Sequence, residues 1–347
     1  MNKIKLKIGL SGLNANDNPG PGVPVARALK EAEKIEASLI GFAYENLEPG
    51  IYMNFLFNKV YQLPYPSSGK EIILERLLYI HNKEKLDVII PNFDSELLTF
   101  INLSEQLKEL GIKTLLPTHE QFEARQKSNL VSFCNKYNLN TPKTISVFNL
   151  QDLYTNIDKF NFPVVVKGQF YEAYIAGNYE QTVMYFNKLS NKWGLPVLIQ
   201  EYLNGTEVNV IALGDGNGNV INYVAMRKLY ITDKGKGWAG VTIKDDNLLN
   251  LTISFFKNTK WNGPLELEIM KTDNNYYILE INPRIPAWVY LTVGVKQNLP
   301  QSLVLLALGE KINPNLDYEP GIMFIRYSWD LISNIKKFKT ISMYGEL

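Results

Sequence analysis

Residues 5–118 alternate short apolar runs with segments of helical periodicity, and this alternation constrains the fold of the first third of the chain. Strands that alternate with helices form parallel sheets covered by helices, because each crossover needs a connection of helix length. The sequence therefore predicts a parallel α/β domain over residues 1–118. The expected strands lie at 5–10, 37–45, 59–63, 87–92 and 113–116, and the expected helices at 23–35, 71–82 and 96–110.

The remaining two thirds of the chain predict a different architecture. A single helix is expected at 119–138, and a small α/β unit is expected to follow it and to end in the strand PVLIQEY. Later strands are joined by short polar turns, which is typical of antiparallel sheet. A last strand candidate, GIMFIRYSW, lies in the tail. We therefore expect five segments: a preceding domain at 1–118, a connecting helix at 119–141, a lid at 142–203, a metal and substrate half at 204–310, and a tail at 311–347.

Composition excludes several classes of protein. The chain has 347 residues, with 36 Lys and Arg against 35 Asp and Glu, so its charge predicts no nucleic-acid partner. No stretch approaches the ~20 apolar residues of a membrane span, and the first residues lack the apolar core of a secretory signal. One cysteine, Cys134, excludes a disulfide framework, and His81 and His119 lack metal-ligand spacing. These features predict a soluble cytoplasmic protein without membrane contact.

The strongest chemical signal is LELEIMKTDNNYYILEINPR, residues 265–284. Alternation along a strand places Glu280 and Asn282 on one face. If 273–275 form a three-residue loop, Glu268 lies opposite Glu280 with Cβ atoms roughly 5 Å apart. Facing carboxylates repel one another unless a cation lies between them, and Mg²⁺ prefers carboxylate, amide and phosphate oxygens. The hairpin thus predicts a magnesium site, and the alternative is an ordinary charged hairpin with solvated glutamates.

Arg284 follows on the same face if the strand continues, and its permanent charge suits an anionic substrate or a phosphate. The run Glu280-Ile281-Asn282-Pro283-Arg284 resembles the metal-binding end of the ATP-grasp superfamily. The resemblance implies that Glu268, Glu280 and Asn282 hold magnesium ions bridging ATP phosphates. It also implies that Arg284 meets an acylphosphate or the substrate carboxylate.

Other parts of the ATP-grasp pattern follow in the expected order. One lysine precedes the Thr141-Pro142 turn and another ends the strand FPVVVKG, and both match the lysines that contact nucleotide phosphates. IQEYLNGTE matches the hinge that reads adenine, followed by an acid for the ribose hydroxyls. Lysine neutralises phosphate as a point charge, and a carboxylate accepts hydrogen bonds from two hydroxyls. The resemblance thus assigns to nucleotide binding Lys127, Lys167, Gln200, Glu201, Tyr202, Leu203 and Glu207.

The resemblance covers most of the chain and implies an architecture. We expect an ATP-grasp fold with a Rossmann-like preceding domain similar to those of biotin carboxylase and the carbamoyl-phosphate synthetase large chain. A small α/β lid and a C-terminal α+β half with antiparallel sheet complete it. The lid departs from many relatives, because KGQFYEAYIAGN, with Tyr171 and Tyr174, stands where they have a glycine-rich loop. Nothing resembles a biotin carrier or a glutaminase, which argues against those two activities.

The function implied by the resemblance is an ATP-dependent carboxylate–amine ligase. It would use ATP with Mg²⁺, or with Mn²⁺ in its place, form an acylphosphate, and release ADP and phosphate. Its substrates would be a small-molecule or peptide carboxylate and an amine, and relatives of this kind often form homodimers. Three alternatives stay open: a peptide-tailoring ligase acting on a ribosomal precursor, a bicarbonate-activating carboxyphosphate enzyme, and an ATP-binding regulator without turnover. Paired acids favour turnover, since a pure nucleotide binder has no need of them.

Several residues are candidates for the substrate side. Arg227, with Lys228, ends an expected strand and is expected to point into the cleft as a catalytic residue. We expect 232–246 to be a mobile loop, with Trp238 near its apex, that either closes over the amine or is a plain surface loop. Asp94 and Glu96 follow a strand end, where ligands of α/β folds gather, so both are candidates for substrate contact. The alternative for Asp94, which we favour, is that it caps a helix.

Two further features carry alternatives. The segment 12–22 follows a strand and precedes a helix, so its backbone N–H groups suit an anion, or it is a connection stiffened by Gly and Pro. Glu266 shares the face of Glu268 and is either a further metal ligand or a partner for Lys228.

Overall fold

The computed structural model describes residues 3–15, 19–169, 172–233, 235–273 and 275–347, which form two compact units. Unit 1 comprises Met1–Phe122, Val210–Glu266 and Asn282–Leu347, and unit 2 comprises Glu123–Asn209 and Leu267–Ile281. The five-segment division stays a prediction. Three strands contain residues of both units: β9 (Thr206–Asp215), β12 (Asn262–Lys271) and β13 (Tyr276–Asn282).

The N-terminal part of unit 1 contains a parallel sheet, as the sequence predicts. Its strand order is β3-β2-β1-β4, and the register places Ile8 beside Leu39 of β2 and Val88 of β4. The fifth expected strand, 113–116, is wrong: the run makes one parallel bridge, from Lys113, and then reaches Pro117, which has no N–H for a ladder. The strands are β1 (Ile4–Leu10), β2 (Ile35–Ala43), β3 (Lys59–Gln62) and β4 (Val88–Ile90).

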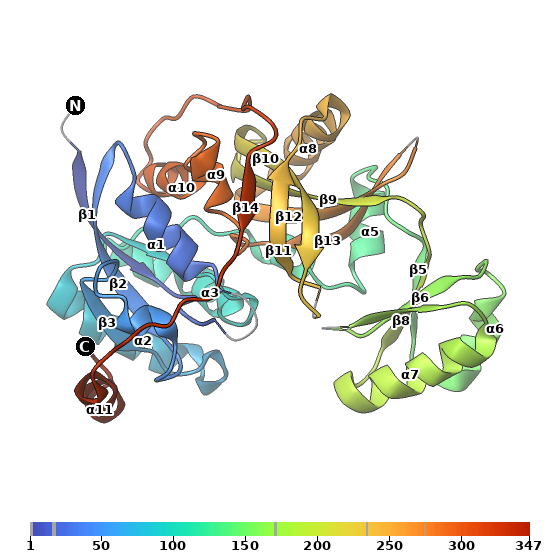
Figure 1. Ribbon diagram of the computed structural model, residues 1–347, viewed down its shortest axis with the longest axis horizontal. Helices are drawn as coiled ribbons and strands as arrows, with labels where there is room; N and C mark the ends of the chain where they lie inside the picture. The colour runs from blue at the N-terminus through green and yellow to red at the C-terminus, as the bar shows by residue number, and fades with distance from the viewer. Residues whose placement is uncertain (1–2, 16–18, 170–171, 234, 274) are drawn as a thin grey trace. The chain divides into compact units, whose positions relative to one another are not determined.

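Helices cover both faces of this sheet, because its strands are apolar on both sides (Figure 1). Leu39 of β2 belongs to the core cluster that contains Val25 and Leu29 of α1. Its neighbour Ile40 belongs to a second cluster, with residues of α2 and α3 such as Leu77. The helices are α1 (Gly22–Lys30), α2 (Lys70–Glu84) and α3 (Asp94–Glu109), and short 3₁₀ turns lie at η1 (Pro49–Tyr52) and η2 (Pro66–Ser68).

A six-stranded sheet has the order β13-β12-β9-β10-β11-β14. Its β10–β11 and β11–β14 pairs are antiparallel, which agrees with the expected architecture. The strands not yet given are β10 (Val220–Ile231), β11 (Gly237–Thr242) and β14 (Met323–Ile325), and the accompanying helices are α8 (Asp246–Thr259), α9 (Leu291–Gly294) and α10 (Leu299–Ala307).

The expected mobile loop at 232–246 is wrong over most of its length. Trp238 lies in β11, which pairs with two neighbouring strands, and Asp246 begins α8; Lys234 lies outside the described residues. One glycine of this segment, Gly240, lies where neighbouring strands pack closely. A Cβ at Gly240 would lie 2.7 Å from both Met226 Sδ and Phe324 Cε1, so glycine lets the three strands approach.

Unit 2 contains a four-stranded antiparallel sheet of order β5-β8-β6-β7. Two helices pack on it through a core that includes Leu153, Val166, Leu189 and Ile199 (Figure 1). The strand β7 was not expected from the sequence. The elements are β5 (Thr144–Val147), α6 (Leu150–Ile157), β6 (Val164–Lys167), β7 (Ala173–Ala176), α7 (Tyr179–Trp193) and β8 (Val197–Glu201).

The single helix expected at 119–138 is wrong, because the structure divides it into α4 (His119–Glu123) and α5 (Leu130–Lys136). The intervening polar run ARQKSN offers few apolar side chains to bury along a helix face. Asn129 instead donates from Nδ2 to the backbone oxygen of Glu123 at 3.3 Å. Lys127 therefore lies in a turn rather than on a helix.

The tail returns to the first sheet. Leu347 and Val60 of β3 exchange backbone hydrogen bonds of 2.8 and 2.9 Å, and Gln62 N donates to Gly345 O at 2.8 Å. The helix α11 (Ile335–Tyr344) precedes this contact and ends at Gly345, which has a positive φ of 67°. The last residues thus cover the edge of β3, a role for the tail that sequence reasoning missed.

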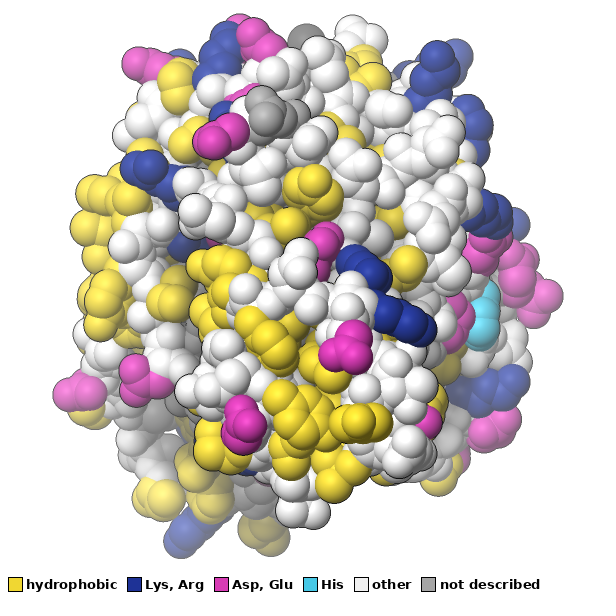
Figure 2. Space-filling model, turned by 90° about the vertical axis from the view of Figure 1, so that its right-hand side faces the viewer, with side chains coloured by type: hydrophobic (Ala, Val, Ile, Leu, Met, Phe, Trp, Pro, Cys, Tyr) yellow, Lys and Arg dark blue, Asp and Glu magenta, His cyan; other side chains and the backbone are white. Residues whose placement is uncertain are grey.

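Surface features complete the description. Figure 2 shows apolar side chains interspersed with charged ones on the face that it views. In unit 2 the exposed apolar residues include Tyr154, Ile175 and Met184. Among the described helices, none combines the length and the apolar character needed to cross a bilayer.

Candidate functional site

Unit 2 brings together charged residues from distant parts of the chain. Lys127 Nζ lies 3.9 Å from Glu280 Oε2, with 15% and 35% of the two side chains exposed. Backbone contacts hold β13 here: Ile278 N donates to Asn140 O at 2.8 Å, and Thr141 Oγ1 donates to Ile278 O at 2.9 Å. The TP turn that follows the first lysine in sequence is therefore the segment that supports the strand carrying Glu280.

Lys167, the last residue of β6, is a partly buried cation of this cluster. Burial lowers the pKa of its ammonium, and the charge of Lys127 lowers it further, whereas Glu280, Glu268 and Glu207 act in the opposite direction. All five side chains thus interact electrostatically through Lys167. Because burial and a like charge both disfavour the ammonium, an additional anion beside it would be stabilising.

The candidate adenine hinge begins in β8, which lies between β5 and β6. Gln200 is buried, and its Nε2 donates to Thr144 Oγ1 at 2.9 Å. The strand ends at Glu201, so Tyr202 and Leu203 leave the sheet. Their backbone groups, rather than the Gln200 side chain, are therefore the part of the hinge suited to reading a base edge.

The acidic pair lies on adjacent strands of the six-stranded sheet, with Glu268 in β12 and Glu280 in β13. Thr272 N donates to Asn275 O at 2.9 Å across the turn. The loop prediction at 273–275 includes Asn274, which lies outside the described residues, so the facing register of the two glutamates stays a prediction. Across the described ranges, no group of three His, Cys, Asp or Glu side chains is arranged to hold a metal.

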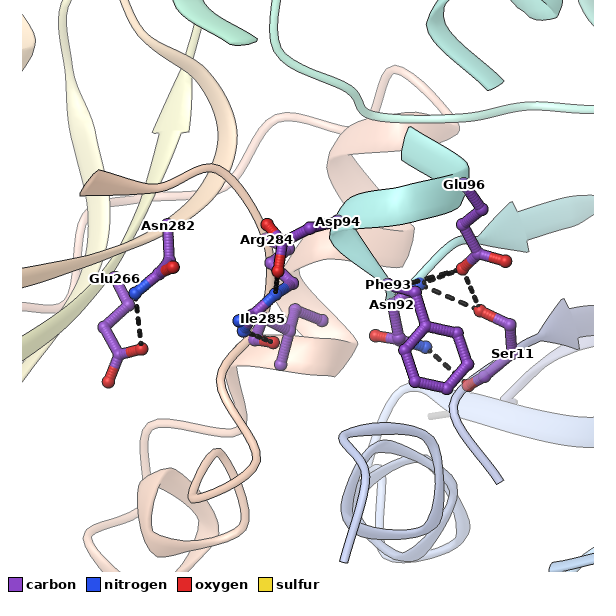
Figure 3. A network of polar contacts seen from close by, with 9 residues as sticks. All are labelled: Ser11, Asn92, Phe93, Asp94, Glu96, Glu266, Asn282, Arg284 and Ile285. Carbon is purple, nitrogen blue, oxygen red and sulfur yellow. Dashed lines mark hydrogen bonds and ion pairs between the residues drawn. The ribbon is translucent and has the colours of Figure 1, made fainter. Parts of the chain in front are cut away.

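Asn282 ends β13 and belongs to unit 1. Its Nδ2 donates to Glu266 Oε2 at 3.3 Å, and the indole Nε1 of Trp288 donates to Glu266 Oε1 at 2.6 Å (Figure 3 shows the first of these contacts). All three side chains are buried, with 6 to 8% exposed. Trp288 was not expected here, since it lies in an irregular segment after Pro283 where no periodicity indicates its direction.

Arg284 does not continue the strand, contrary to the sequence expectation. Its N–H donates to Asn282 O at 2.8 Å, so the chain turns after Asn282. The guanidinium Nε then donates to Asp94 Oδ2 at 2.7 Å (Figure 3). Asp94 opens α3 but does not cap it: the N-cap residue is Phe93, whose N–H donates to Glu96 Oε1 at 3.0 Å.

Glu96 is the centre of a buried network at the carboxyl ends of β1 and β4. Ser11 Oγ and Tyr44 Oη donate to it, and Asn92 N donates to its Oε1 at 2.7 Å. Burial raises the pKa of Glu96, and the hydrogen bonds from Ser11 and Tyr44 counteract that effect. Asn92 also donates from Nδ2 to Ser11 O at 2.9 Å, so the network joins the two strand ends (Figure 3).

Two other candidates that the sequence predicts in unit 1 are Arg227 and the segment 12–22. Arg227 is exposed in β10 opposite Val241 of β11, and its catalytic role stays a prediction. Of the segment 12–22, residues 16–18 lie outside the described residues. Gly22 N donates to Gly12 O at 2.9 Å, and a Cβ at Gly22 would lie 2.1 Å from Ser11 O, so this glycine is needed for a close backbone approach.

Comparison with solved structures decides the fold. The biotin carboxylase domain dimer of Hydrogenobacter thermophilus 2-oxoglutarate carboxylase, in complex with MgADP and bicarbonate, matches with a TM-score of 0.68 and 16% identity, over 88% of this chain and 70% of that one. N5-carboxyaminoimidazole synthetase from Staphylococcus aureus matches with a TM-score of 0.69 and 15% identity, over 92% of this chain and 81% of that one. The chain has the ATP-grasp fold.

Sequence comparisons agree with this ATP-grasp assignment. Residues 195–326 match the family model described as ATP-grasp in the biosynthetic pathway with Ter operon. The carbamoyl phosphate synthase large chain of Clostridium botulinum strain Kyoto is 26% identical over 266 residues, which is 72% of this chain and 24% of that protein. The corresponding Clostridium acetobutylicum protein is 23% identical over 232 residues, or 62% and 21%. The chain thus spans about a quarter of the length of the curated relatives that it matches.

Proposed function

We propose that this ATP-grasp protein is an ATP-dependent carboxylate–amine ligase that acts through an acylphosphate and releases ADP and phosphate. The observation that carries the proposal is the cluster of unit 2, in which Lys167 interacts with Lys127 and with three glutamates. Cations and acids gathered at one partly exposed place suit a ligand that is both anionic and metal-bound, such as a nucleotide triphosphate with magnesium.

The nucleotide is assigned to residues of unit 2. Lys127 and Lys167 neutralise phosphate charge, and backbone groups within Gln200–Leu203 read the adenine edge. Glu207 accepts hydrogen bonds from the ribose hydroxyls. The lowered pKa of Lys167 supports its part in this assignment, because phosphate oxygens favour the ammonium form that burial disfavours.

The metal is assigned to Glu268, Glu280 and Asn282. The donor set fits Mg²⁺, which in nucleotide sites takes one or two carboxylates and completes its shell with phosphate oxygens and water. When bound, the ion neutralises phosphate charge and so lowers the repulsion between the γ-phosphate and an attacking carboxylate.

Residues of unit 1 are assigned to the substrates other than the nucleotide. Arg284 binds the substrate carboxylate or the acylphosphate, and its bond to Asp94 holds the guanidinium beside the carboxyl edge of the parallel sheet. Ligands of open α/β sheets gather at this edge. Arg227 is proposed to contact a substrate from β10. By analogy with the dimeric biotin carboxylase domain that it resembles, a homodimer is proposed as well.

Bicarbonate is the second candidate for the activated acid. The Hydrogenobacter biotin carboxylase domain that matches this fold was crystallised with bicarbonate. A carboxyphosphate formed from bicarbonate would use the same lysines, metal ligands and Arg284. The two candidates differ in which anion stimulates phosphate release.

Phosphate release from MgATP tests the proposal. Purified protein is screened against carboxylate and amine pairs, including peptides, and against bicarbonate alone. We expect one pair to stimulate release, and Glu280→Gln to lower that rate about 100-fold or more, because an acid that holds the transferring group's cation is removed. Glu105→Gln makes the same chemical change on an exposed position of α3 and should leave the rate unchanged.

Each outcome favours one function. Release stimulated by an acid–amine pair supports the ligase, and release with bicarbonate alone supports carboxyphosphate chemistry. ATP binding without turnover of any pair would instead indicate a regulator. Equal rates for the wild type and Glu280→Gln would contradict the assigned metal site.

A further inference from the structure

Glu266 holds two hydrogen-bond donors in the interior of unit 1. Trp288 Nε1 lies 2.6 Å from Oε1, and Asn282 Nδ2 lies 3.3 Å from Oε2. Each carboxylate oxygen therefore has its own donor, and each donor comes from the segment that follows β13 or ends it. A buried side chain satisfied in this way is better suited to fixing its neighbours than to serving as a metal ligand.

The chemistry of the pair determines how the Asn282 amide is turned. A carboxylate oxygen accepts hydrogen bonds and cannot donate them, whereas an asparagine has an amino group on one side and a carbonyl oxygen on the other. The amino group must therefore face Glu266, which leaves Oδ1 directed away from it. Only Oδ1 can bind a cation, so the orientation decides whether Asn282 is able to act as a ligand.

Trp288 in turn fixes the orientation of the Glu266 carboxylate. Its indole N–H is a donor without an acceptor function, and at 2.6 Å it forms the shorter of the two bonds. The rigid indole ring is buried, so it cannot follow a rotating carboxylate. The chain of contacts runs from the indole through the carboxylate to the amide, and each step allows one orientation.

We propose that Glu266 and Trp288 are positioning residues that hold the Asn282 amide with Oδ1 toward the nucleotide-bound magnesium. The inference rests on the proposed function, in which Asn282 is a metal ligand. The inference gives Glu266 one role: Glu266 orients the metal ligand Asn282 and does not bind the metal itself. It also assigns a task to Trp288, which the ATP-grasp resemblance did not include.

Glu266→Gln tests the orientation directly. The new amide oxygen accepts from Trp288, so its amino group faces Asn282, whose own amide must then turn over and present Nδ2 to the metal. We expect the affinity for Mn²⁺, measured by electron paramagnetic resonance with a non-hydrolysable ATP analogue, to fall about 10- to 100-fold. Trp288→Phe removes one donor and should weaken Mn²⁺ binding in the same direction.

A double variant supplies the decisive comparison. In Glu266→Gln/Asn282→Asp, the amino group introduced at 266 donates to the carboxylate introduced at 282, which keeps a second oxygen for the metal. Every hydrogen bond and the local charge are preserved, so Mn²⁺ affinity should return to within about threefold of the wild type, well inside the 10- to 100-fold loss expected of the single change. A role limited to stability does not predict this recovery. The double variant also keeps the test available if the single variant fails to fold.

Trp261→Phe is the matched control. Trp261 is also fully buried in unit 1, and its Nε1 has no hydrogen-bond partner among the described residues. The substitution removes the same indole group without removing a bond to an acceptor. It should leave Mn²⁺ affinity unchanged, whatever it does to the melting temperature.

A second readout needs no metal. With ¹⁵N-labelled tryptophan, the indole N–H of Trp288 should exchange slowly with solvent in the metal-free wild type, as expected for a buried, hydrogen-bonded donor. Rapid exchange at Trp288 in a folded protein would contradict the proposed contact.

The outcomes separate the inference from the proposed function. If the wild type binds no Mn²⁺ with the ATP analogue, the proposed function fails. If the wild type binds it and Glu266→Gln binds it equally well, the positioning role is wrong while the function stands. Weak binding by the single variant without recovery in the double variant also overturns the positioning role.

Discussion

Single residues in unit 2 bring charges of both signs together at the proposed nucleotide site. Lys167 is a partly buried ammonium with a second cation nearby, and three glutamates offset part of the cost of removing its charge from water. Such a group is stable only with partners, since an isolated buried charge is expensive. The nucleotide phosphates of the proposed reaction are anions that would complete the set.

Cys134 in the same unit should be chemically inert. It is fully buried in α5, and burial raises the pKa of its thiol to about 12. At pH 8 the thiolate fraction is then about 2,000-fold smaller than for an exposed thiol of pKa about 8.5, and the thiolate is the reactive form. We expect no labelling by Ellman's reagent in the native protein and complete labelling in guanidinium chloride. Fast labelling of the native protein would show that the thiol is accessible.

The sequence predicted charged candidates better than it predicted their partners. Lys127, Lys167 and Glu280 lie in recognisable motifs, and the structure brings them together. Trp288 and Glu96 were harder to assign, because their contacts come from segments distant in sequence. Local capping rules favoured Asp94 as the cap of α3, but the ion pair with Arg284 takes up that side chain.

At the scale of elements, the secondary structure of polar and glycine-rich segments was the hardest to predict from the sequence. Alternation and periodicity identified β1, β2, α2 and α3 because each has a clear apolar face. The strand β11 falls within the segment 232–246 that the sequence analysis predicts as a mobile loop. Its pairing with β10 and β14 depends on tertiary packing that propensity does not include.

The C-terminal residues that bond to the edge of β3 make a testable electrostatic contribution. Lys83 Nζ lies 2.9 Å from Glu346 Oε1, and the hydrogen bond from Lys83 lowers the pKa of Glu346. A lowered pKa means that the stabilisation is present above the unfolded value near 4.5 and is lost as pH falls through the folded value. A partly exposed pair contributes roughly 0.2–1 kcal/mol.

We therefore expect Glu346→Gln to speed exchange of the Leu347 amide about two- to fivefold at pH 7, since the pair contributes at most about 1 kcal/mol. Below the folded pKa of Glu346 the variant and the wild type should exchange alike. Nuclear magnetic resonance of the amide protons of Val60 and Leu347 provides the measurement, because each N–H donates to the carbonyl oxygen of the other residue. Glu319→Gln, at an exposed position of the same tail, is the control. A difference that persists at low pH would point to a cause other than the ion pair.

At the scale of the whole molecule, the candidate residues divide between the two units. Lys127, Lys167, Glu207, Glu268 and Glu280 belong to unit 2, and Asn282, Arg284 and Arg227 belong to unit 1. The ATP-grasp fold was predictable because its motifs occur in a fixed order along the chain. The division into units was not, because three strands cross it and no change of composition marks the crossing points.

The position of the metal is the central claim. Anomalous diffraction from crystals grown with Mn²⁺ and a non-hydrolysable ATP analogue tests it most directly. We predict manganese density with oxygens of Glu268, Glu280 and Asn282 at about 2.1 Å, together with phosphate oxygens. A nucleotide bound with its cation elsewhere, and with the two glutamates pointing away from one another, would contradict the proposed site.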